Sequence, residues 1–205
     1  MKESIRSSTY ELWNFCKKEL LSGENDQIIL DEVFLAIDKK IINKDELLIE
    51  TRYTGISYGT EKIVFDSNVP SNQYNLMKAP HQEGSFNTSV KYGYLNVGEV
   101  KVGPRELMNK MVYSMYPHQT KFIIKSSLVT QIPAAVPLKR ALLTANMETA
   151  INAMWDSNPM IGDKTYVVGA GVVGILMAYV LSKTFGLDVI IIDKDIKKKN
   201  ICNFS

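Results

Sequence analysis

The spacing of hydrophobic and polar positions changes about two thirds of the way along the chain. Up to residue 133 the apolar residues form short runs, often alternating with polar positions, which is typical of β-strands. We expect strands at 10–15, 31–37, 47–53, 90–100, 112–115 and 121–124. A helix over 10–21 competes with the first of these strands, because its apolar residues also fit one helical face.

The pattern after residue 133 has longer periods. A helical pattern covers 138–155 and ends at Asn158-Pro159, and an apolar β-branched run follows at 165–168. A second helical pattern, 172–185, stops at Gly186, and another apolar run covers 189–192. Many strands followed by strand–helix–strand predict a mixed α/β chain with a β-rich part and a doubly wound part. We place the boundary at the turn 131–133, which gives domains 1–133 and 134–205.

Glycines follow the strand at 165–168 in the spacing Gly169-x-Gly171-x-x-Gly174. In such a turn the first glycine permits the tight bend, the second lets a pyrophosphate approach the backbone, and the third lets the helix pack near the strand. The free N–H groups of the first helical turn, which includes Val172 and Val173, would hold the phosphates. We therefore predict a dinucleotide site here. FAD and S-adenosylmethionine folds use similar turns.

An acid ends the second apolar run. Asp193 lies 193 − 174 = 19 residues after the last glycine, where an acid that binds the adenosine ribose hydroxyls is expected. A carboxylate there favours NAD over NADP, because it would repel a 2′-phosphate. Lys194 follows directly and would weaken that preference.

Composition excludes several classes of protein. The 205 residues are 45% hydrophobic and 22% charged with a net charge of +2, as in an ordinary globular protein, and show no basic stripe for nucleic acid. The run 197–199 of lysines is interpreted as solvated surface. Cys16 and Cys202 suggest neither a disulfide framework nor a zinc cluster. No signal peptide or membrane span is expected, so the predicted compartment is the cytoplasm.

Four segments in order carry a family resemblance: GISYGTE (55–61), VKYGYLNVGEV (90–100), ANMETAINAMW (145–155) and VVGAGVVG (167–174). They resemble the medium-chain dehydrogenase/reductases, the zinc alcohol dehydrogenases and quinone oxidoreductases, and in particular a subgroup similar to the bacteriochlorophyllide dehydrogenases. The resemblance implies a GroES-like β-domain followed by a Rossmann domain, a nicotinamide cofactor and a small-molecule substrate. It also implies that Thr149 lies near the nicotinamide.

The chain departs from the zinc enzymes at the ligand positions. Ser57 stands where the resemblance places the first catalytic cysteine, Tyr94 where it places the histidine, and Ala145 where some members have a third ligand. Serine, tyrosine and alanine do not make a zinc site. Residues 101–125 also lack the cysteines of the structural zinc lobe. We expect a zinc-free member. His81 and His118 remain as possible ligands, but scattered loop histidines are more often surface groups.

Without zinc, a substrate carbonyl needs a hydrogen-bond donor. Tyr94, with Ser57 nearby by the resemblance, is the candidate donor, although a tyrosine packed at a domain cleft explains the residue equally well. Glu61 is a candidate for positioning water or substrate. A carboxylate at the start of a helix is the alternative interpretation, since Gly59-Thr60-Glu61 would open a helix through 62–65 as readily as a loop.

The chain ends about twelve residues after Asp193, at Ser205. A Rossmann domain has six strands, and the nicotinamide binds against the second half. We therefore expect an incomplete, C-terminally truncated Rossmann domain whose two parallel strands have uncovered apolar faces. An inactive fragment with weak adenine-nucleotide binding is the alternative function. A homodimer is expected only if the missing half is present, and a separate polypeptide that supplies it is a third possibility.

Overall fold

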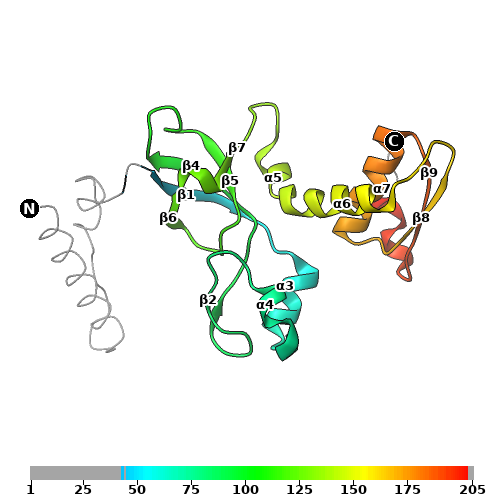
Figure 1. The fold of residues 1–205 in the computed structure, drawn as a ribbon, viewed down its shortest axis with the longest axis horizontal. Helices are drawn as coiled ribbons and strands as arrows, with labels where there is room; N and C mark the ends of the chain where they lie inside the picture. Colours follow the sequence, from blue (N-terminus) through cyan, green and yellow to red (C-terminus); the bar gives the residue numbers. More distant parts are fainter. Residues whose placement is uncertain (1–42, 44, 203–205) are drawn as a thin grey trace, which may run out of the picture.

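Figure 1 shows the computed structural model, which describes residue 43 and residues 45–202. The strands predicted at 10–15 and 31–37, the competing helix over 10–21 and Cys16 lie outside the described residues. Within them, a β-rich part leads through two helices into a strand–helix–strand unit (Figure 1). The predicted mixed α/β class is therefore confirmed.

The β-rich part is built on one antiparallel sheet in the order β6-β1-β4-β5-β7. β1 lies between β6 and β4, and its residue Ile49 pairs with both Val100 and Phe122. The strands predicted at 47–53, 112–115 and 121–124 are confirmed within two residues. The bounds are β1 Glu46–Thr54, β4 Asn96–Val102, β5 Met111–Ser114, β6 Lys121–Lys125 and β7 Val129–Gln131.

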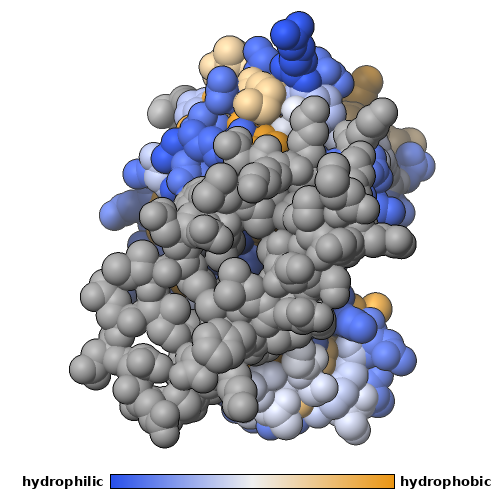
Figure 2. Space-filling view, turned by 90° about the vertical axis from the view of Figure 1, so that its left-hand side faces the viewer, coloured by the Kyte–Doolittle hydropathy of each residue, from blue (hydrophilic) through white to orange (hydrophobic). Residues whose placement is uncertain are grey.

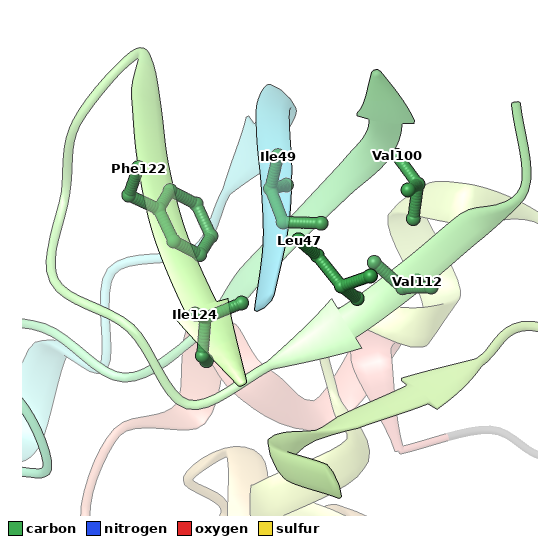
Figure 3. Close-up of a cluster of buried hydrophobic side chains, with 6 residues drawn as sticks. All are labelled: Leu47, Ile49, Val100, Val112, Phe122 and Ile124. Carbon is green, nitrogen blue, oxygen red and sulfur yellow. The ribbon is translucent and has the colours of Figure 1, made fainter. Parts of the chain in front are cut away.

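Side chains from four of these strands meet on one face and form a buried cluster (Figure 3). Along β6 the alternation is regular, since Phe122 and Ile124 are buried while Lys121, Ile123 and Lys125 are exposed. Removing a side chain of this size from water stabilises the fold by about 1.5–3 kcal/mol. The cluster comprises Leu47, Ile49, Val100, Val112, Phe122 and Ile124. On the face shown in Figure 2 the described residues are mainly hydrophilic.

The strand predicted at 90–100 is divided. β3 (Val90–Lys91) pairs with β2 (Glu83–Gly84), and the chain then bends before β4 begins at Asn96. Gly93 has φ +123°, a conformation that side-chain-bearing residues rarely adopt, so the ladder cannot continue through it. Gly98 remains in the ladder, and a Cβ there would lie 2.8 Å from the Glu50 carbonyl oxygen. The two glycines thus mark a bend and a close backbone approach.

Two stretches between β1 and β2 are helical. Residues 58–65 form α3 (Tyr58–Phe65), the alternative to a loop, and 67–84 contains η1 (Ser71–Gln73) and α4 (Tyr74–Met77). These pack over a second buried cluster that includes Val64, Val69 and Phe86. A short 3₁₀ turn, η2 (Ser126–Leu128), joins β6 to β7.

The helix predicted over 138–155 is two helices, α5 (Leu138–Ala141) and α6 (Thr144–Ser157). The Thr144 hydroxyl donates to the Ala141 carbonyl at 2.7 Å, and such a side-chain bond competes with the helical ladder at the break. Asn158 adopts the left-handed conformation and ends α6 as predicted.

The last part of the chain forms β8 (Lys164–Val168), α7 (Val172–Phe185) and β9 (Asp188–Ile192), with β8 and β9 parallel. All three elements match the sequence prediction, and Gly186 ends α7 in the left-handed conformation. α6 packs against α7, so that Met154 is buried with Val167 and Leu181. The 3₁₀ segment η3 (Ile196–Ile201) follows. No described helix has the length and apolar character that a membrane span requires.

The face of β8 and β9 that points away from α7 is apolar and exposed. Val167, Val189 and Ile191 face α7, whereas the alternate residues do not contact that cluster. Their exposed fractions are 59% for Tyr166, 82% for Val168, 42% for Ile190 and 48% for Ile192. Parallel sheets normally have both faces covered, so this face matches the uncovered sheet that the sequence predicted.

Candidate functional site

The glycine turn lies between β8 and α7. Gly169 has φ +108° and its N–H donates to the Ile192 carbonyl at 2.7 Å, which ties the turn to the end of β9. Gly171 is extended and precedes the first helical residue, Val172. A Cβ built on Gly169 or Gly171 would meet no atom within 4 Å. The space beside the turn is therefore open to a ligand.

Gly174 is required for a different reason. A Cβ at this position would collide with the carbonyl oxygen of Gly169 and approach the Val167 side chain at 3.5 Å. The first turn of α7 thus packs directly on the end of β8. The N–H groups of its first residues, Val172 and Val173 among them, have no partner within the helix and face the N-terminal end, where anions are favoured.

Asp193 is joined to the turn. Its Oδ2 accepts a hydrogen bond from the Ala170 N–H at 2.7 Å, and its Oδ1 accepts one from the Asp195 N–H at 2.8 Å. Lys198 Nζ lies 2.9 Å from Oδ2, and the Asp193 side chain is 13% exposed. The hydrogen bond from Lys198, followed by those from Asp195 and Ala170, holds the pKa of Asp193 well below its usual range. The carboxylate is therefore ionised beside the turn.

Lys198 was missed by the sequence analysis, which interpreted the lysine run 197–199 as solvated. η3 folds back so that Lys198 is half-buried against Asp193, and the hydrogen bond to that carboxylate raises the pKa of Lys198. Asp195 starts this segment by accepting from the Lys197 N–H at 3.0 Å. A hollow of about 410 Å³ lies here, with Ala170 and Asp193 in its wall. The one local signal for the pairing of Lys198 with Asp193 is the acidic sequence Asp193-Lys194-Asp195 just before the lysine run.

Thr149 lies on α6, is exposed, and donates to the Ala145 carbonyl at 3.1 Å. None of the hydrogen bonds among the described residues joins it to the glycine turn. Its predicted contact with the nicotinamide remains a prediction.

The β-rich part brings together the other three predicted site residues at the first turn of α3. The Tyr94 hydroxyl donates to Thr60 Oγ1 at 3.4 Å, and the ring meets Tyr92 edge-on with centroids 6.3 Å apart. The backbone of Tyr94 is held as well, since its carbonyl accepts from the Tyr113 hydroxyl at 3.1 Å. The side chain is half-buried, with its hydroxyl directed at α3.

Ser57 and Glu61 are connected through the helix start. Glu61 Oε1 accepts from the Ser57 N–H at 2.7 Å, whereas the Ser57 hydroxyl makes no capping bond. The carboxylate thus stabilises the start of α3, as the alternative interpretation of Glu61 proposed. The loop before it packs against Leu95, and a Cβ on Gly55 would lie 3.2 Å from that side chain.

The second oxygen of Glu61 has a partner that the sequence analysis did not assign. His118 Nε2 lies 2.7 Å from Glu61 Oε2, and the two side chains are 33% and 13% exposed. The hydrogen bond to Glu61 raises the pKa of His118, and burial opposes that shift. His118 is therefore a partly exposed side chain with a specific partner, and not a free surface group. The residues are 57 positions apart, and no sequence spacing connects them.

Gly93 makes this approach possible. A Cβ on Gly93 would lie 2.8 Å from His118 Cδ2 and 2.9 Å from Nε2. The bend that interrupts the predicted strand 90–100 is thus also the place where the imidazole packs on the backbone. His81 differs, since it stacks on Tyr116 with centroids 4.6 Å apart.

In the part of the chain that the structure describes, no three His, Cys, Asp or Glu side chains are grouped as metal ligands. Ser57 and Tyr94 occupy the region where the resemblance places two zinc ligands, and neither is a customary ligand of zinc. The absence of a catalytic zinc remains a prediction.

No protein-family model matches the chain, and no curated protein matches it. Solved structures do. A short chain alcohol dehydrogenase from Escherichia coli CFT073, complexed with NADH, is 15% identical with a TM-score of 0.60, over 77% of this chain and 52% of its own. A quinone oxidoreductase from Thermus thermophilus, also determined with NADPH, is 14% identical with a TM-score of 0.56, over 76% and 47%.

A cinnamyl alcohol dehydrogenase from Sorghum bicolor is 16% identical with a TM-score of 0.55, over 77% of this chain and 53% of its own. These likenesses confirm the predicted fold, a GroES-like β-domain followed by part of a Rossmann domain. The chain spans about half the length of these structures.

Proposed function

We propose that the chain belongs to an NAD(P)-dependent oxidoreductase of the medium-chain dehydrogenase/reductase type. The observation that carries this proposal is the unit of glycine turn and acid, in which open space beside Gly169 and Gly171 is bordered by the ionised Asp193. The structural neighbours with NADH or NADPH support a nicotinamide cofactor.

The residues present fit a dinucleotide. A pyrophosphate fits where Cβ atoms on Gly169 and Gly171 would otherwise project, against the N-terminus of α7. Asp193 would accept hydrogen bonds from the ribose hydroxyls with its remaining lone pairs. We propose NAD as the preferred cofactor, because a 2′-phosphate would approach this carboxylate. Lys198 neutralises part of that charge and limits the preference.

When bound, the nicotinamide supplies the hydride. The protein's part is to hold the substrate oxygen and stabilise its developing charge, and we propose Tyr94 as the hydrogen-bond donor. Its hydroxyl donates a long hydrogen bond of 3.4 Å to Thr60 Oγ1, and a substrate oxygen that is a better acceptor would replace this partner. Ser57 lies at the same helix start as a second hydroxyl, and no zinc takes part. The proposed substrate is a small alcohol, carbonyl or conjugated compound.

A second candidate function is adenine-nucleotide binding without hydride transfer. The observation that favours it is the exposed face of β8 and β9, where Val168 and Ile192 lie uncovered by the described residues. The β8-α7-β9 unit corresponds to the adenosine half of a dinucleotide site. A chain limited to this unit would hold the adenosine portion and leave the nicotinamide without a binding surface.

Calorimetric titration with ADP-ribose and with NADH separates these candidates. Both ligands should bind if the turn and Asp193 form the site, and NADH alone should support reduction of an aldehyde or quinone panel. Equal affinity for the two ligands, with no turnover, would favour nucleotide binding only. Absence of binding by either ligand would contradict both functions.

A further inference from the structure

Glu61 and His118 form a carboxylate–imidazole pair that the proposed roles of Tyr94 and Ser57 do not use. The pair joins α3 to the segment between β5 and β6 through a 2.7 Å bond between Oε2 and Nε2. Each partner is fixed on its other side: Glu61 Oε1 by the Ser57 N–H, and the imidazole by its packing on Gly93. The geometry is therefore set by the backbone of three separate segments.

One ring nitrogen of the imidazole remains available. Nε2 faces Glu61, while Nδ1 makes no hydrogen bond with any described residue. A carboxylate on one nitrogen holds the ring orientation and favours the protonated form, which leaves the other nitrogen to exchange a proton with a ligand. Nucleophile–base pairs in enzymes are oriented in the same manner.

The pair lies in the wall of a hollow of about 620 Å³ along α3, which we call the α3 groove. Three large apolar side chains, Ile56, Tyr58 and Phe65, also line it and are mostly exposed. Their uncovered surface would be buried by a ligand with an apolar body.

The Glu61–His118 pair lies next to Tyr94, the residue already proposed as the hydrogen-bond donor to the substrate. Thr60, which accepts from Tyr94, and Glu61, which contacts His118, are neighbours in the first turn of α3. A single turn of helix therefore carries both the hydrogen-bond contact and the acid–base contact.

We propose that the α3 groove binds a carbonyl substrate with an apolar body, and that His118 is the catalytic acid that protonates its oxygen while Glu61 positions the imidazole. This inference rests on the proposed function. In the reduction, hydride adds to the carbonyl carbon, the C=O π pair becomes an alkoxide, and the proton on Nδ1 of His118 passes to that oxygen. The neutral imidazole keeps its Nε2–H on Glu61 and regains a proton from water. In the reverse reaction it accepts the proton of the alcohol.

Other ionisable groups near the imidazole are known. Lys62 and Asp66 line the groove and form an ion pair with each other, and Tyr58 lines it as well. The Tyr94 hydroxyl donates to Thr60, the residue of α3 that precedes Glu61. Burial raises the pKa of the neighbouring Tyr92 to about 12. A pH dependence assigned to His118 must therefore disappear with His118 itself and respond to Glu61.

The test compares the wild-type chain with His118→Gln, Glu61→Gln and the matched control His81→Asn. NADH-dependent reduction of apolar aldehydes and ketones is followed between about pH 5 and 9, the range in which histidine titrates. NADH affinity is measured separately by fluorescence. We expect His118→Gln to lose about 100-fold in kcat with unchanged NADH affinity. In the wild type, kcat for reduction should fall as pH rises through the raised pKa of His118.

Glu61→Gln should move that fall to lower pH, and His81→Asn should keep the wild-type profile. An NMR titration of the His118 ring in wild type and Glu61→Gln reads the same shift without turnover. If His118→Gln keeps the wild-type kcat and pH profile, the role of His118 as the catalytic acid is overturned. The proposed oxidoreductase function is not affected by that result. If the wild type binds NADH but reduces no carbonyl compound, both the role of His118 and the proposed hydride transfer are overturned.

Discussion

The Ala170 N–H donates a 2.7 Å hydrogen bond to Oδ2 of Asp193, so the glycine turn and the acid at the end of β9 form one unit. This bond fixes the carboxylate beside the opening over Gly169, at the position that we propose for the ribose hydroxyls. Hydrogen bonds to an ionised acceptor are stronger than those between neutral groups, so the charge of this carboxylate matters for binding.

Asp193→Asn should therefore weaken NADH binding by about 10- to 100-fold. The matched control is Asp188→Asn at the other end of the same strand, where the side chain is exposed. Affinity is measured by calorimetry at fixed salt. Equal effects of the two substitutions would show that Asp193 does not touch the cofactor.

The turn glycines should separate folding from binding. Gly174→Ala forces a Cβ into the Gly169 carbonyl, and overpacking of this kind costs about 1–3 kcal/mol or more. Gly171→Ala meets open space in an extended conformation, so its free energy of unfolding should stay near the wild-type value. Both variants should bind NADH poorly, as measured by calorimetry. Chemical denaturation should show a loss of stability for Gly174→Ala alone. A stable Gly174→Ala would contradict the close packing of α7 on β8.

Tyr94→Phe should lower kcat by about 100-fold if the hydroxyl stabilises the substrate oxygen. Its structural cost should be small, because the bond to Thr60 is long. The control is Tyr92→Phe, whose hydroxyl donates to the Met77 carbonyl at 2.7 Å and whose loss should cost about 1 kcal/mol of stability without changing kcat. Unchanged turnover in Tyr94→Phe would remove the residue from the mechanism.

The Glu61–His118 pair should give stability a defined pH dependence. The hydrogen bond to Glu61 raises the pKa of folded His118 above the unfolded value of about 6.5. The pair therefore stabilises the fold fully below that value, and the contribution is lost as pH rises through the raised pKa. Glu61→Gln should flatten this dependence, as measured by urea denaturation at a series of pH values. A dependence that survives in Glu61→Gln would have to come from another group.

The uncovered face of β8 and β9 should bind hydrophobic dyes. Val168→Thr keeps the β-branched shape in the strand but removes apolar surface, and should lower dye fluorescence without lowering the melting temperature. Ile123→Thr on β6, which is also exposed, serves as the control and should leave most of the signal. An equal loss in the two variants would indicate that the dye does not report on the face of β8 and β9.

The β8-α7-β9 unit was predicted within a residue or two, because each of its signals is local. Alternating or continuous apolar runs specify the strands, and Gly186 stops α7 where a left-handed residue is needed. The glycine spacing and Asp193 lie within one stretch of chain, so their proximity follows from a single strand–helix–strand connection. The strands that form most of the β-sheet were predicted for the same reason.

Two predicted elements are interrupted. The helix at 138–155 is broken before Thr144, whose hydroxyl bonds to the nearby Ala141 carbonyl, whereas the strand at 90–100 is broken at Gly93, where His118 from a distant segment packs on the backbone. Lys198 turned out to be a partner of Asp193 because η3 folds back on the turn.

The sequence by itself determined the glycine turn, its acid and the alternation of the sheet, since periodicity and short spacing encode contacts between residues near in the chain. Only the tertiary structure decided that Glu61 meets His118. That pair depends on the order of strands in the sheet and on a bend that only glycine accommodates, and a separation of 57 residues leaves no periodic trace.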